Sequence, residues 1–220
     1  RAAHVAPHYS RRRATFAGRR TKAGALVGFH ARGSHGVTSV ASCMILHPDL
    51  THSLPLLEEL VARFGTRKGE MALSLTRAEN GLDLSIIANR RLDDRQRADL
   101  AHWAGQSGFA RLAWDGEIIA QAYSPVHRLG PALVTPPPNA FLQATKDAEA
   151  AMQASVSEIA SGARHVADLF SGCGTFALPL SQQAKVLAVE ASQEMLNACE
   201  LGWRNTSGLR PIQHMVRDLF

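Results

Sequence analysis

The chain has 220 residues, of which 45% are hydrophobic and 20% charged, enough to bury a sizeable core in one or two domains. No stretch approaches 18 consecutive apolar residues, and no apolar run follows the basic start, so neither a membrane contact nor a signal peptide is expected. The three cysteines are too few and scattered for a disulfide framework or a thiolate metal site, which favours a reducing, cytoplasmic setting without bound metal.

The net charge of +5 is unevenly distributed along the chain. Residues 1–48 hold eight Arg or Lys and no Asp or Glu, so this segment carries +8 and the rest −3. A one-signed block of this length favours contact with a polyanion such as nucleic acid, and its densest part is the run Arg11, Arg12 and Arg13. The alternative is a solvated basic tail, but the strand-like sequence around the run favours a folded surface.

The first part of the chain is predicted to contain three short strands and a helix. The strands are separated by turn sequences and lie at 12–18, 25–31 and 36–42. The helix follows over about 54–64, where leucines recur at helical spacing behind a capping residue, and Gly65 ends it.

Two hairpins and a second helix are predicted next. The first hairpin turns at Asn80-Gly81, the second turns at Asp115-Gly116, and the helix at about 93–107 lies between them. The proline-rich PALVTPPPN that follows is interpreted as a stiff connector. Residues 1–138 are therefore predicted to form an antiparallel α+β domain that carries the basic surface.

The pattern changes after this connector. An alanine-rich helix is predicted at 141–161, and three strand-like runs then alternate with helix-length segments, at 165–170, 185–190 and 211–218. Strand–helix alternation implies parallel pairing through crossovers. Residues 139–220 are therefore predicted to be the first half of a Rossmann-like, doubly wound α/β domain.

A glycine-rich stretch, DLFSGCGTFA, follows the first of these strands. Gly172 and Gly174 permit a sharp turn and close approach of a ligand to the backbone, and the helix expected next offers free N–H groups. Glu190 lies 18 residues beyond Gly172 at the tip of the next strand, where a carboxylate accepts hydrogen bonds from ribose hydroxyls. Asp218 falls at the same edge, so a nucleoside-bearing cofactor is expected there.

The cofactor is predicted to be S-adenosylmethionine rather than a nicotinamide dinucleotide. Asp168 stands just before the loop, where its charge would receive the amino acid end of S-adenosylmethionine and repel a pyrophosphate. Gly-x-Gly-x-x-Ala alone also fits a nicotinamide site, and a glycine turn used only for packing is the plainer alternative.

Several motifs carry a family resemblance. DLFSGCGTFALPL and VLAVEAS, with NAFLQATKDAEAAM upstream, resemble the RNA (uracil-5-)-methyltransferases. The segments HYSRRRATF and VGFHARGSHGVTSVASCMILHP resemble the central domain of the branch that modifies 23S ribosomal RNA more than the transfer-RNA branch. The resemblance covers nearly the whole chain and implies a class I S-adenosylmethionine-dependent methyltransferase domain in residues 139–220.

The resemblance assigns roles to two residues before the first parallel strand. Gln143 matches the family glutamine that touches the cofactor near the target base, and Phe141 matches the aromatic beside it, suited to packing on a flipped uracil. The alternative interpretation is that Phe141 is a core aromatic and that Gln143 is a polar residue at the start of a helix.

The resemblance also assigns four further residues to cofactor binding. Phe170 and Thr175 match loop positions that contact it, although Thr175 replaces the asparagine often found there. Glu190 matches the acid that binds the ribose, and Asp218 matches a polar position at the adenine end.

The catalytic groups of the family are not matched. Methylation of uracil C5 needs a nucleophile at C6 and a base for the C5 proton, which the family supplies from a cysteine and a glutamate expected here beyond Phe220. None of Cys43, Cys173 and Cys199 takes that position, so the chain alone is predicted to be inactive. The strand at 165–170 is expected to leave one unpaired, hydrophobic edge that invites self-association.

Three functions are thus weighed. The preferred one is methylation of uridine C5 in RNA, ribosomal RNA rather than transfer RNA. An RNA-binding module without catalysis and a fragment of a nicotinamide-dependent oxidoreductase are the alternatives.

Overall fold

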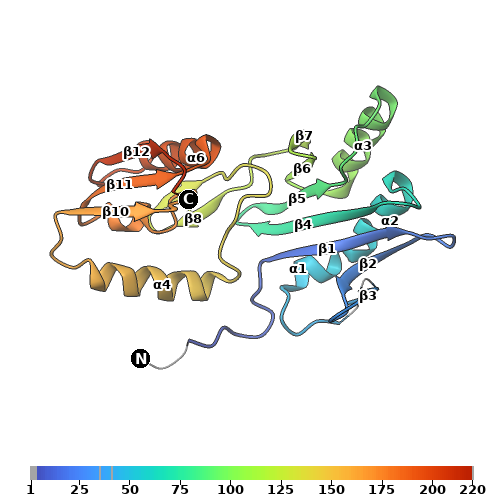
Figure 1. Cartoon of the computed structure of the whole chain (residues 1–220), viewed down its shortest axis with the longest axis horizontal. Coiled ribbons are helices and arrows are strands. Elements are labelled where there is room, and N and C mark those ends of the chain that lie inside the picture. The colour runs from blue at the N-terminus through green and yellow to red at the C-terminus, as the bar shows by residue number, and fades with distance from the viewer. Residues whose placement is uncertain (1–3, 35, 41, 220) are drawn as a thin grey trace. The chain divides into compact units, whose positions relative to one another are not determined.

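A computed structural model describes residues 4–34, 36–40 and 42–219; Arg1 of the basic block and Phe220 lie outside them. The chain divides into two compact units, residues 7–125 and residues 126–219 with the N-terminal 4–6 (Figure 1). This division falls before the expected boundary at 138, because part of the sequence interpreted as a connector forms β9 (Ala132–Val134). β9 packs on α6 (Gln193–Arg204) of the second unit, where Val134 approaches Gly202.

The first unit is built on a seven-stranded sheet in the order β3-β2-β1-β4-β5-β6-β7. Every neighbouring pair is antiparallel except β5 and β6, so the expected antiparallel α+β fold is observed with one parallel pair. The strands are β1 (Arg13–Arg20), β2 (Ala25–His30), β3 (Val37–Ser39), β4 (Glu70–Ala78), β5 (Gly81–Ile87), β6 (Arg111–Trp114) and β7 (Glu117–Gln121).

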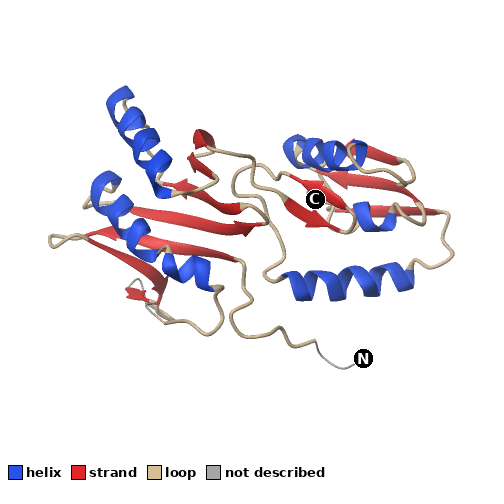
Figure 2. Ribbon diagram, turned by 180° about the vertical axis from the view of Figure 1, so that it is seen from behind, coloured by secondary structure: helices blue, strands red, loops and turns tan. Residues whose placement is uncertain are grey.

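Three helices accompany this sheet: α1 (Pro48–His52), α2 (Leu54–Phe64) and α3 (Asp94–Ser107). Figure 2 shows α1 and α2 over one face of the sheet. Burial of the apolar side of α2 drives this packing, since Leu57, Leu60 and Val61 are fully buried. Asp93 caps the start of α3 and forms a capping box with Gln96.

The second unit contains a parallel three-stranded sheet in the order β10-β11-β12. The strands match the three predicted runs: β10 (His165–Leu169), β11 (Lys185–Glu190) and β12 (Ile212–Val216). Figure 1 shows them pointing in one direction. The unit also contains β8 (His127–Leu129), which pairs with β9, and the helices α4 (Lys146–Ile159), α5 (Ala177–Leu180) and α6 (Gln193–Arg204).

α5 differs from the expectation drawn from the glycine-rich stretch. It has only four residues, with Pro179 inside it, so the N–H groups and dipole of a long helix are not offered to a ligand. The backbone of the loop itself must therefore provide most of the contacts.

No helix in the described part of the chain is long and apolar enough to cross a membrane. Across the same residues, no three His, Cys, Asp or Glu side chains gather in a way that could hold a metal ion.

Candidate cofactor site

The three parallel strands of the second unit end at one edge. Leu169 pairs with Val189 and Glu190 pairs with Val216, so the loops after β10, β11 and β12 emerge side by side. Asp218 follows β12 by two residues and is exposed. The carboxyl edge of such a sheet is where ligands of doubly wound folds bind.

The glycine loop turns sharply back from β10 at this edge. The Ser171 N–H donates to Val189 O at 3.0 Å, and the Gly174 N–H donates to Ser171 O at 2.9 Å. Phe170, Gly172 and Gly174 all have positive φ angles, of 61°, 56° and 92°. A phenylalanine in this left-handed backbone conformation costs on the order of 1 kcal/mol. The conformation leaves the Phe170 side chain 56% exposed at the edge of the sheet.

The two glycines serve different purposes. A Cβ on Gly174 would lie 2.6 Å from Cys199 Sγ and 2.9 Å from Leu178 Cδ1, so Gly174 is required for packing of the loop on α5 and α6. A Cβ on Gly172 would meet only Met195 Cε at 3.8 Å, so the space above Gly172 is open. Gly172 is thus the position where a ligand can approach the backbone.

Glu190 is held against the loop by two backbone donors. The Gly172 N–H donates to Oε2 at 3.0 Å and the Ser192 N–H donates to Oε1 at 3.1 Å. The predicted proximity of the glycine turn and the acid on the next strand is therefore confirmed. Each carboxylate oxygen accepts more than one hydrogen bond, so both retain capacity for hydroxyl donors.

Asp168 is the second carboxylate of this region and is 9% exposed. Burial, with a further contribution from the charge of Glu190, raises the pKa of Asp168 to about 6 against a lowering effect of the Ala177 N–H. Its Oδ2 atom has no hydrogen-bond partner among the described residues. A buried carboxylate oxygen without a donor is costly, which marks a place where a cationic or hydrogen-bonding group would fit.

Thr175 lies in the same loop, and its carbonyl accepts a hydrogen bond from Gln153 Nε2 at 3.0 Å. Gln153 belongs to α4, so this contact fixes the loop to the helix. This contact could not be predicted from the sequence, because a polar residue in an alanine-rich helix has no distinctive pattern.

Phe141 and Gln143 lie on the segment that leads into α4, which Thr145 caps through a 3.1 Å hydrogen bond from the Ala148 N–H. The Phe141 side chain is 63% exposed, which argues against a core aromatic, and Gln143 is half-buried. Their roles toward base and cofactor stay predictions.

The cysteines of the second unit are inert in this structure. Cys173 and Cys199 are buried, and burial raises the pKa of each thiol to about 12. Neither provides a thiolate at neutral pH, consistent with leaving both out of catalysis.

The arginine run lies in the first unit and is not a uniform surface. Arg11 is exposed, whereas Arg12 is only 2% exposed and Arg13 is half-buried. Burial and the charge of Arg11 lower the pKa of Arg13. The expectation that all three arginines face a polyanion therefore fails at Arg12, because alternate residues at the start of β1 point to opposite faces of the sheet.

A solved structure has the same fold as this chain. The chain superposes on the tRNA (uracil-54, C5)-methyltransferase of Pyrococcus abyssi, solved in complex with S-adenosyl-L-homocysteine, with a TM-score of 0.73. The match covers 95% of this chain and 55% of that one at 16% identity. The fold is that of an S-adenosylmethionine-dependent methyltransferase, as predicted.

Sequence comparison makes the relationship more specific. Uncharacterized RNA methyltransferases of Brucella suis and Rhizobium meliloti are 40% and 35% identical, over 97% and 96% of this chain and 51% of each relative. The 23S rRNA (uracil(1939)-C(5))-methyltransferase RlmD of Shewanella halifaxensis is 28% identical, over 96% of this chain and 50% of its own length. No family model matches the chain.

The chain is similar to these RNA methyltransferases over nearly its whole length, and the predicted resemblance is confirmed. It spans about half the length of the relatives that it matches.

Proposed function

We propose that the protein serves in S-adenosylmethionine-dependent methylation of uridine C5 in RNA, to which this chain supplies most of the cofactor site, and that the carboxyl edge of β10–β12 holds this cofactor. The observation that carries the proposal is the joint position of the glycine loop, Glu190 and Asp168. The 23S rRNA branch is preferred over the tRNA branch because the N-terminal motifs resemble it and RlmD aligns along nearly the whole chain.

The residues present fit the proposed cofactor. Glu190 accepts hydrogen bonds from the two ribose hydroxyls, with its orientation fixed by the Gly172 and Ser192 N–H groups. The orphaned Oδ2 of Asp168 accepts from the ammonium of the amino acid end. Phe170 packs beside the ligand, and Asp218 serves its adenine end.

When bound, S-adenosylmethionine supplies an electrophilic methyl group. The described residues bind and orient it; Gln143 is proposed to touch the cofactor near the target base, and Phe141 is proposed to pack on that base. We assign the attack on uracil C6 and removal of the C5 proton to no described residue, since the Cys173 and Cys199 thiols are buried and neutral and Cys43 belongs to the first unit rather than to the proposed cofactor site. This chain alone is therefore expected to transfer no labelled methyl group to RNA.

The proposal is tested by calorimetric titration with S-adenosylhomocysteine and, separately, NADH. We expect saturable binding of the first and none of the second, because Asp168 repels a pyrophosphate. Glu190→Gln should weaken S-adenosylhomocysteine binding by roughly tenfold, about 1.4 kcal/mol, through loss of charge-assisted hydrogen bonds.

The matched control is Glu194→Gln, which removes the same charge from an exposed position in the first turn of α6. Its affinity should equal that of the wild type. Preferential binding of NADH would support the oxidoreductase alternative, and RNA binding without any cofactor affinity would support the binding module.

A further inference from the structure

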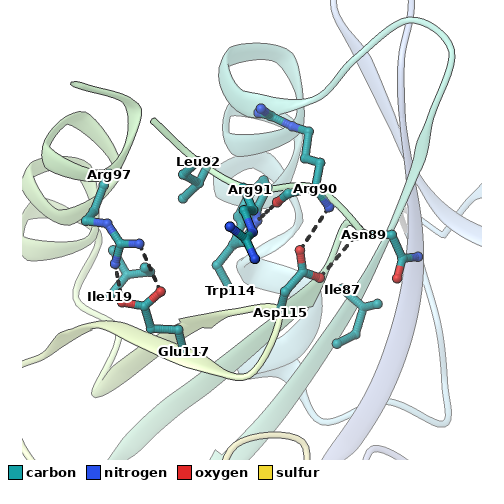
Figure 3. A pocket seen from close by; sticks show the side chains of 10 residues that line it. All are labelled: Ile87, Asn89, Arg90, Arg91, Leu92, Arg97, Trp114, Asp115, Glu117 and Ile119. Carbon is teal, nitrogen blue, oxygen red and sulfur yellow. Dashed lines mark hydrogen bonds and ion pairs between the residues drawn. The ribbon is translucent and has the colours of Figure 1, made fainter. Parts of the chain in front are cut away.

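The first unit contains a cavity that the proposed cofactor site does not use. It has a volume of about 740 Å³ and lies where β5 leads into α3 and β6 turns into β7 (Figure 3). Its lining combines apolar side chains with charged ones, among them Arg90, Arg91, Arg97, Asp115 and Glu117.

Most charges at this rim are already satisfied. Figure 3 shows Arg97 and Glu117 joined as an ion pair, and Asp115 bonded to the loop after β5. Asp115 accepts from the backbone N–H groups of Ala88, Asn89 and Arg90 at 2.8–3.1 Å. These bonds fix the loop and offset the negative charge of Asp115.

Arg90 is also held in place. Its Nη2 donates to Phe64 O at 2.6 Å and its Nη1 donates to Gln96 Oε1 at 3.2 Å, while the guanidinium lies 5.4 Å from the Trp114 ring centre. Arg91, next along the chain, is exposed and makes no ion pair or hydrogen bond with the described residues. Of the arginines that line the cavity, Arg91 is therefore the one without an ion pair or hydrogen bond among the described residues.

The same end of the sheet gathers further cations from distant parts of the sequence. The Arg90 bond to Phe64 brings the loop after β5 to the end of α2, and Arg20 Nη1 donates to Gly65 O at 3.2 Å from the end of β1. The exposed cations of these segments are Arg19, Arg20, Lys22, Arg63, Arg67 and Lys68. Glu70, the first residue of β4, is an acid beside these connections and pairs with Arg19 and His30.

We infer that this basic end of the first unit, with Arg91 at the cavity as its anchor, binds the phosphate backbone of the RNA substrate. The inference rests on the proposed function for the identity of the polyanion. A guanidinium fork matches phosphate oxygens, and a row of cations on neighbouring loops follows a phosphodiester chain. The large exposed hydrophobic residues of the unit are not in these loops, so the surface lacks the apolar anchors of a typical protein interface.

The test measures binding of a fluorescent single-stranded RNA oligonucleotide to the full chain by anisotropy over a range of salt concentrations. Arg91→Gln should weaken binding by about fivefold and lower the slope of log affinity against log salt by about 0.7, the value for one released counterion. The double variant Arg67→Gln/Lys68→Gln should lower the slope by about twice that amount. Arg91→Lys keeps the charge and should retain the slope.

The control is Arg164→Gln, which removes an exposed arginine just before β10, at the amino end of the parallel sheet. It should change affinity less than Arg91→Gln. Equal losses in both variants, or a loss confined to Arg11→Gln, would overturn the inference while leaving RNA as the substrate. Absence of RNA binding by the wild type would contradict both proposals, and equal Arg91-dependent binding of polyglutamate would indicate an acidic protein instead.

Discussion

Asp168 and Glu190 show how two carboxylates at one strand edge acquire different properties. Glu190 accepts two backbone hydrogen bonds, whereas Asp168 is buried with one oxygen lacking a donor. In the proposed complex, the positive charge of the ligand would stabilise the ionised form of Asp168. Without that ligand, Asp168 makes the fold less stable at neutral pH.

The loss of stability caused by the buried Asp168 carboxylate is testable through the pH dependence of unfolding. Because the pKa of Asp168 rises from 3.8 to about 6, the folded chain binds more protons in that range and loses stability as pH increases through it. Asp168→Asn should therefore raise the free energy of unfolding by roughly 2–3 kcal/mol at pH 8 and change it little at pH 4.

Urea denaturation at the two pH values measures this difference. The same variant should bind S-adenosylhomocysteine more weakly. Weaker binding would indicate that the Asp168 carboxylate contacts the ligand and does not only destabilise the fold. The difference in free energy of unfolding between Asp168→Asn and wild type is the quantity to compare at the two pH values. If this difference favours the variant less at pH 8 than at pH 4, the raised pKa assigned to Asp168 is contradicted.

Individual residues also show the limits of prediction from sequence. The spacing of Gly172 and Glu190 was sufficient to place them together, because parallel strands bring successive tips to one edge. The burial of Arg12 could not be inferred from charge density, since it depends on which face of β1 packs against the core. The uncommitted Arg91 was missed for a similar reason, because its setting requires β5, β6 and α2 to be brought together.

At the scale of elements, the glycine loop is a rigid part of the fold. Gly174 fits closely between α5 and α6, whereas Gly172 faces open space. Gly174→Ala should destabilise the chain by about 2–3 kcal/mol through overpacking and strain, and Gly172→Ala by about 1 kcal/mol through its positive φ alone. Chemical denaturation compares the two variants, and equal losses would show that this packing difference is absent.

The edge strand β10 leads to a second prediction at this scale. β10 pairs only with β11 among the described strands, and the Leu169 side chain is 55% exposed. We therefore expect the chain to associate with itself as its concentration increases, as unprotected edges do. Sedimentation velocity should show larger species for wild type than for Ala167→Lys, which places a charge on an exposed position of β10. A monomer at every concentration would contradict this expectation.

Strand positions were predicted better than element lengths and boundaries. The alternation and turn signals of both sheets are local, so the hairpins and parallel strands appear where expected. The short α5 and the inclusion of β8 and β9 in the second unit depend on tertiary packing, which the proline-rich sequence conceals.

For the whole molecule, the two units divide the proposed work. Residues 7–125 present the basic end proposed for RNA, and the second unit presents the carboxyl edge proposed for the cofactor. The charge distribution predicted a polyanion surface within residues 1–48, whereas the basic end proposed here also includes cations from outside that block, such as Arg67 and Arg91, which join it only in the folded chain.

The central claim is that an adenosine-bearing methyl donor binds between the glycine loop and Glu190. Amide NMR of the chain, titrated with S-adenosylhomocysteine, tests it directly. The amide signals of Gly172 and Ser192, which donate to Glu190, should shift and saturate together, while those of Asn89 and Arg90 at the other cavity should stay unchanged. Saturable shifts at Asn89 and Arg90, with Gly172 and Ser192 unmoved, would contradict the account.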